Sequence, residues 1–257
     1  MKFIKTLLAG AALLAAGFGS VQAATVDGVT WDPNYSASLG DNDFTARYNM
    51  LQWYVTGANA IASTPNLNAN PGLAILNPPG SIGDVLQGVG LVNTINGTSQ
   101  GVFAPTGELT FVFGGYTVTG ATTLTPGWLN IYYDATPDSS LVNGTGFNDG
   151  VLWLSLVGAS TTFAGTALNA GSLSTYFNVT GGDAAPYFQD ANIALFFGAD
   201  AQGGAYAQFN AGSPYATTQG TLYSDSKDIP EPSSVALLGL GLAGLGFAQR
   251  RRKTASK

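Results

Sequence analysis

The basic residues of the chain are concentrated at its two ends, and an apolar run lies beside each basic group. The part of the chain that can fold in water is therefore residues 24–228. Of the nine lysines and arginines, seven lie in residues 2–5 or 250–257. Residues 24–228 hold 14 acidic residues against two basic ones, a formal charge of −12. A surface this acidic repels phosphate backbones, so we expect no nucleic-acid partner.

Residues 1–23 have the pattern of a secretory signal peptide. Lys2 and Lys5 form a positive start, residues 6–19 are apolar, and small side chains follow up to Ala23. This order predicts recognition by signal peptidase and cleavage after Ala23. We therefore expect residues 24–257 to leave the cytoplasm.

The C-terminal segment, residues 225–257, has three parts in a fixed order. A linker over residues 225–233 contains Pro230, Glu231 and Pro232, and prolines are excluded from helix interiors. An apolar run over residues 234–248 follows; as a helix it is about 22 Å long, against roughly 30 Å of bilayer hydrocarbon.

A basic tail over residues 249–257 follows the run. Its arginines can snorkel to the interface and halt translocation, so we expect a transmembrane helix with the tail in the cytoplasm. The stop-transfer residues are Arg250, Arg251, Arg252 and Lys253.

This tail resembles the PEP-CTERM protein-sorting domain, with the sequence PEPSSVALLGLGLAGLGFAQRRRK over residues 230–253. That domain occurs on exported proteins of Gram-negative bacteria that make exopolysaccharide. The resemblance implies a membrane-embedded exosortase as the processing partner, with Pro230, Glu231 and Pro232 as the sorting motif. It also implies an inner-membrane-anchored precursor that later reaches the cell surface or the extracellular matrix.

Between the ends, short β-branched and aromatic segments alternate with Gly and Asn turns, which is typical of an all-β domain. We expect one sandwich or jelly-roll-like domain over residues 24–224. Residues 108–119 are predicted to form two strands joined by a tight turn at Gly114-Gly115. Further strands are expected at residues 26–31, 128–133, 151–157 and 174–180, and residues 81–92 could make one short helix.

The central stretch also resembles segments that recur among PEP-CTERM proteins, some of them linked to floc formation. The similar segments are GDVLQGVG, GELTFVFGGYTV and GWLNIYYDATPD, followed by NDGVLWLSL, within residues 83–157. This resemblance implies a surface or matrix role and brings no catalytic residues.

The composition excludes several kinds of catalysis. The chain has no cysteine and no histidine, so a thiolate nucleophile, a zinc or haem site and a Ser-His-Asp triad are all excluded. Carboxylate chemistry stays open as a glycosidase alternative, with Glu108 as the one glutamate of the domain. We expect Glu108 to be a strand-end residue in water, and we predict that the protein is not an enzyme.

Calcium is the metal that the composition leaves open, because hard cations bind several oxygen ligands. Two groups of aspartates have suitable spacing, although ordinary turn chemistry explains both. We predict no cofactor, with calcium as the alternative. Its candidate ligands are Asp41, Asp43, Asp134 and Asp138.

Aromatic residues raise the alternative of a sugar-binding module, because an exposed planar ring stacks on a pyranose face. The candidates are Trp31, Trp53 and Trp128. The inner faces of a β domain also require large rings, so most of the aromatics are expected in the core. The sequence thus predicts an exported, non-enzymatic surface or matrix protein that associates with exopolysaccharide in biofilm or floc.

Overall fold

The computed structural model describes residues 23–33, 35, 43–60, 76, 81–142, 144–168, 170–188, 193–197, 207–208 and 216–224. All of them lie in one unit, Ala23–Lys227. The predicted signal peptide up to residue 22, the linker, the transmembrane helix and the basic tail lie outside the described residues. Among the described residues, no helix has the length and apolar character needed to cross a membrane.

The described part is built from strands, with three short helices between them. The helices are η1 (Gly57–Asn59), α2 (Gln100–Phe103) and η2 (Ala185–Tyr187). The strands are β1 (Ala24–Val26), β2 (Val29–Trp31), β3 (Phe44–Val55), β4 (Val85–Ile95), β5 (Thr98–Ser99), β6 (Glu108–Gly120), β7 (Thr123–Leu124), β8 (Trp128–Asp134), β9 (Val151–Ala167), β10 (Ala170–Gly181), β11 (Ile193–Phe197), β12 (Ala207–Gln208) and β13 (Ala216–Ser224).

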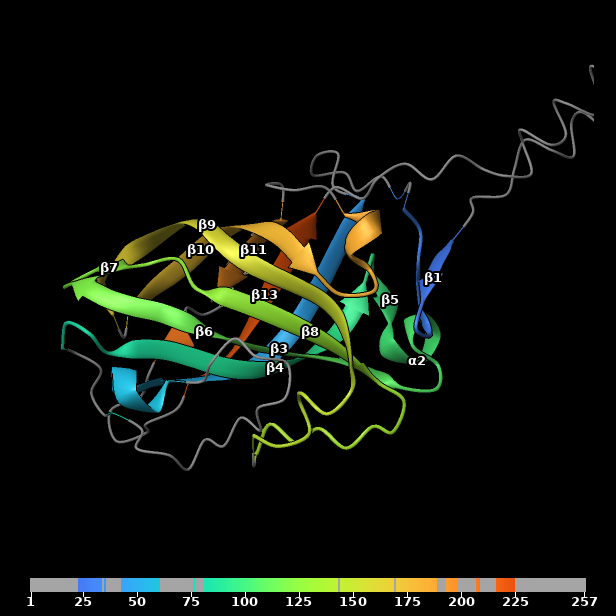
Figure 1. Cartoon of the computed structure of the whole chain (residues 1–257), viewed down its shortest axis with the longest axis horizontal. Helices are drawn as coiled ribbons and strands as arrows, with labels where there is room; N and C mark the ends of the chain where they lie inside the picture. The colour runs from blue at the N-terminus through green and yellow to red at the C-terminus, as the bar shows by residue number, and fades with distance from the viewer. Residues whose placement is uncertain are drawn as a thin grey trace, which may run out of the picture. The chain divides into compact units, whose positions relative to one another are not determined.

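Apart from the β1–β2 hairpin, these strands form one antiparallel sheet that curls back on itself (Figure 1). The hydrogen-bonded order is β5-β4-β3-β13-β11-β10-β9-β8-β6-β7, and β4 also pairs with β6. This last pairing returns the path to its start, so opposite parts of the sheet face one another across a shared core, as the two sheets of a sandwich do. The predicted all-β class is confirmed.

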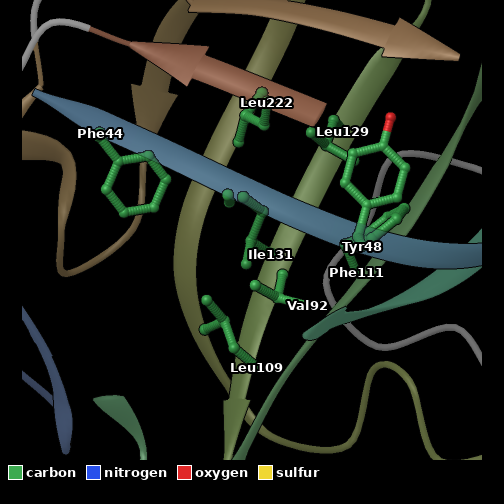
Figure 2. A pocket seen from close by; sticks show the side chains of 9 residues that line it. Phe44, Tyr48, Val92, Leu109, Phe111, Leu129, Ile131 and Leu222 are labelled. Carbon is green, nitrogen blue, oxygen red and sulfur yellow. The ribbon is translucent and has the colours of Figure 1, made fainter. Parts of the chain in front are cut away.

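The interior of the curl is filled by large apolar side chains from strands that are distant in the sheet order. Figure 2 shows Phe44 and Tyr48 of β3 near Leu129 and Ile131 of β8 and Leu222 of β13. The remaining space is about 10 Å³, close to the least that one water needs. This interior is therefore a packed core with no room for a ligand.

A second apolar cluster lies on the opposite side of β3, β4, β6 and β8. Its buried members are Leu51, Trp53, Val55, Val85, Val89, Val112, Tyr132 and Phe147. Side chains of a strand alternate between faces, so β3 buries Tyr48 on one face and Leu51 and Trp53 on the other. Burial on both faces explains why residues 50–55 of β3 and residues 85–90 of β4 are buried at every position.

The predicted turn at Gly114-Gly115 is wrong, because both residues lie within the single strand β6. Gly115 has φ of +77°, and a Cβ on Gly114 would come within 2.9 Å of the Trp128 ring. The glycine pair therefore bends β6 and leaves room for the indole on β8, instead of reversing the chain.

The predicted helix at residues 81–92 is also wrong, because Val85–Ile95 is strand β4. Gly88 and Gly90 pair with Phe113 and Phe111 of β6. A Cβ on Gly90 would overlap the Phe111 ring. These glycines are strand residues that accommodate the facing rings.

The strand predicted at residues 26–31 is instead a hairpin, β1–β2. Asp27 and Gly28 form its two-residue turn with φ of +51° and +93°. An Asp-Gly pair is favoured in such turns because both central residues need positive φ. The hairpin places Trp31 against Trp153 and Phe188.

Candidate functional site

Carboxylates from distant parts of the chain meet where β6 begins and β8 ends. Glu108 pairs directly with Asp134 across the two strands. The segment after β8 then folds back and brings Asp138 to the same place. Carboxylate oxygens of Glu108, Asp134 and Asp138 all lie within 4.8 Å of one another.

Glu108 is 4% exposed, and the returning segment encloses it. The backbone N–H groups of Asp138 and Ser139 donate to its Oε1 over 3.0 and 2.8 Å, and the Ser139 hydroxyl donates to its Oε2 over 2.7 Å. Glu108 is at the end of a strand, as predicted, because β6 begins with it, but the expectation that it lies in water is wrong. Hydrogen bonds from the segment after β8 exclude water from it.

One further hydrogen bond and one close backbone approach fix the course of this segment. Thr110 donates its hydroxyl to the Phe147 carbonyl over 3.0 Å, at a buried position. Gly146 has φ of +75°, and a Cβ there would collide with Oδ1 of Asp138. Glycine is therefore required where the backbone passes the Asp138 carboxylate.

The charges of the cluster repel one another. The charge of Asp149 raises the pKa of Asp138 above its ordinary value, and loss of hydration and the charges of Asp134 and Glu108 act in the same direction. Among the described residues Arg47 is the only basic one, and it lies in β3. An oxygen-only group of this kind suits a hard cation, or a proton on Asp138.

The predicted calcium ligands are thus brought together in part. Asp134 and Asp138 meet, joined by Glu108, which the calcium prediction omitted. Asp43 precedes β3 and is not a member of this group, and Asp41 lies outside the described residues. Glu108 opens β6 whereas Asp134 closes β8, so no local spacing pattern could have added it.

The predicted sugar-stacking tryptophans do not form an exposed row. Trp31 and Trp53 are 3% and 0% exposed, so neither has a ring face available to a sugar, and the prediction is wrong for both. Trp128 is half-buried beside Gly114 and Gly115. Among the residues that the structure describes, the exposed aromatic ring is that of Tyr176 in β10, which is 50% exposed.

The sequence does contain a signal for Tyr176. In β10 the buried positions are Leu173, Thr175 and Phe177, and Tyr176 falls on the other, polar face of that alternation. A search for tryptophans alone misses it, whereas the period of the strand identifies it as an aromatic ring in water.

The sorting residues of the tail lie outside the described part of the chain, as do its basic residues. Ala23, the predicted cleavage position, is exposed, and Ala24 begins β1. The position of the cleavage itself stays a prediction.

Comparison with known proteins identifies the tail. The family model of the PEP-CTERM protein-sorting motif matches residues 228–253. No curated protein and no solved structure matches the chain. The motif implies export, a membrane-anchored precursor in a Gram-negative bacterium and processing by exosortase. The chain therefore carries a PEP-CTERM protein-sorting motif over residues 228–253.

Proposed function

We propose that this protein is a non-enzymatic component of the cell surface or extracellular matrix, which associates with exopolysaccharide in biofilm or floc. The sorting motif at residues 228–253 is the observation that carries the proposal, because it directs the acidic β domain out of the cell. Signal peptidase and exosortase would act on its two ends, and the apolar run would hold the precursor in the membrane. No cofactor is required.

The state of Glu108 supports a non-enzymatic role over a glycosidase. A catalytic carboxylate has to reach the glycosidic bond. Glu108 is buried, and both of its oxygens accept hydrogen bonds from Asp138 or Ser139. Its contacts are those of a residue that fixes a loop.

The proposal is tested by fractionating cultures of the producing bacterium and of a strain that makes no exopolysaccharide. We expect the protein in the matrix fraction of the first strain and in the medium or membrane of the second. The same distribution in both strains would contradict the association. The purified protein should release no reducing sugar from the exopolysaccharide; release that disappears in Glu108→Gln would establish a hydrolase instead.

A further inference from the structure

One continuous part of the domain surface carries no charge. Residues 150–182, which include all of β9 and β10, contain no Asp, Glu, Lys or Arg, although residues 24–228 carry 14 acidic residues. Strand β11 is also uncharged, and β8 has one acid, Asp134, at the end opposite Trp128. Other strands, such as β4 and β13, are uncharged as well. Strands β9 and β10 differ from them because the exposed large apolar side chains of the described strands, Val151, Val157 and Tyr176, lie there with no charged residue beside them on either strand.

The pairing register shows which side chains share the outer side of this region. Trp128 of β8 pairs with Val157 of β9, which pairs with Asn178 of β10. Directly paired residues in an antiparallel sheet point to the same face. Tyr176 is two positions before Asn178 on the same strand and pairs with Ser160. We call this surface the uncharged face; its residues are Trp128, Val157, Ser160, Thr162, Tyr176 and Asn178.

The opposite side of β9 and β10 is core. Strand β8 is buried on both sides from Leu129 to Tyr133, so only Trp128 at its end reaches the uncharged face, half-buried against the second apolar cluster. Leu173, Thr175 and Phe177 of β10 are buried, so the strand cannot rotate to hide Tyr176 without exposing them. Tyr176 and Val157 are therefore held in water, 50% and 47% exposed. Hydrogen bonds from Thr180 to Ser155 and from Ser155 to Asn130, of 3.1 and 2.8 Å, tie the three strands together beside them.

We propose that the uncharged face binds a neutral polysaccharide chain, with Tyr176 as the stacking ring and Trp128 at a second contact. This inference rests on the proposed function and adds the surface and the chemical class of the polymer. A sugar ring presents an apolar C–H face to an aromatic ring and hydroxyl groups at its edge. The ring of Tyr176 supplies the first contact, and Ser160, Thr162 and Asn178 supply hydrogen-bond partners for the second.

The spacing suits a chain better than a single sugar. Trp128 lies two strands from β10, and Tyr176 is two residues along from the position in register with Trp128. For flat strands this separates the two rings by about 12 Å, which a monosaccharide does not span. An anionic polymer would be repelled by the acidic remainder of the domain, whereas a neutral one would not.

The test uses the mature protein purified from its producing bacterium, and the exopolysaccharide of that bacterium separated by anion exchange into neutral and anionic fractions. Binding to each fraction is measured by affinity electrophoresis. The variants are Tyr176→Phe, which keeps the ring, and Tyr176→Thr, which removes it but keeps a good strand residue. Val142→Ala is the control, since Val142 is 91% exposed and lies in the loop between β8 and β9.

We expect binding to the neutral fraction, retained in Tyr176→Phe and Val142→Ala and weakened about tenfold in Tyr176→Thr, which is near the upper end for one aromatic contact. Unchanged thermal midpoints show that the variants fold.

Wild-type affinity in Tyr176→Thr would overturn the assignment of the face while the proposed function stands. Binding to the anionic fraction alone would overturn the chemical class. Loss of self-association in Tyr176→Thr, with sugar binding intact, would identify a second copy as the occupant. No binding to either fraction would refute the proposed function itself.

Discussion

The carboxylates of Glu108 and Asp138 have different effects on the segment between β8 and β9, residues 135–150. Glu108 accepts three hydrogen bonds from it, whereas the charge of Asp149, the loss of hydration and the charges of Asp134 and Glu108 disfavour the charged form of Asp138 and raise its pKa. Both residues are acids at one place in the fold, yet their effects have opposite sign. The difference is that the oxygens of Glu108 face N–H and O–H donors, while the carboxylate of Asp138 faces other acids.

This arrangement predicts a pH dependence for Asp138. Its pKa is raised in the folded protein, so the folded state binds the proton more tightly than the unfolded chain does. The contribution of this group to stability therefore falls as pH rises through the interval above the ordinary aspartate pKa, and the loss is complete above the raised value. Asp138→Asn should raise the thermal midpoint at pH 7 and have little effect near pH 4.

A calcium ion bound by these carboxylates predicts the reverse. Calcium would then raise the midpoint of the wild type, and Asp138→Asn would lower it at pH 7. Thermal denaturation of both proteins, with calcium and with a chelator, separates the two outcomes. A lower midpoint for Asp138→Asn in the presence of chelator would contradict the repulsion.

Strand β4 accommodates the aromatic rings of its neighbour β6 by having glycine at the positions that face them. Gly90 faces Phe111, and a Cβ there would also lie 2.8 Å from the carbonyl oxygen of Asn49 on β3. The backbone on one side and the ring on the other leave no space for a methyl group. A glycine is unfavourable in an isolated strand, so its presence here reflects the packing of β3, β4 and β6.

Gly90→Ala should therefore destabilise the domain by about 1–3 kcal/mol, the usual cost of overpacking a core. Gly101→Ala is the matched control, because no atom lies within 4 Å of a Cβ at Gly101 in helix α2. Urea denaturation measures both. Adding Phe111→Leu to Gly90→Ala should recover part of the loss; equal stability of the two alanine variants would contradict the proposed packing.

The same elements show what the sequence could predict. Aromatic and branched residues predicted β8, the start of β9 and most of β10. The sequence of β4 does not show a strand alternation, because glycines take the place of large residues at its inward positions opposite Phe113 and Phe111. Gly114-Gly115 has the composition of a turn, and only the Trp128 ring on the next strand shows that it lies inside β6. The burial of Glu108 could not be predicted for the same reason, because the segment that buries it lies far from it in the sequence.

At the scale of the whole molecule, function depends on the separation of charge along the chain. Cations beside apolar runs mark the ends, and the domain between them is acidic. The sorting motif at residues 228–253 belongs to one of those ends. The proposed function needs no catalytic group in the β domain, because the role proposed for the domain is to be placed outside the cell and to contact polymer there.

The most direct measurement is the intact mass and the cell fraction of the protein, for the wild type and for a variant with alanine at Pro230, Glu231 and Pro232. The wild type should be found outside the cytoplasm, shortened at both ends relative to the 257-residue chain. The variant should lose residues 1–23, keep its tail and stay in the membrane. Identical masses for the two proteins, or the complete polypeptide free in the cytosol, would contradict the account.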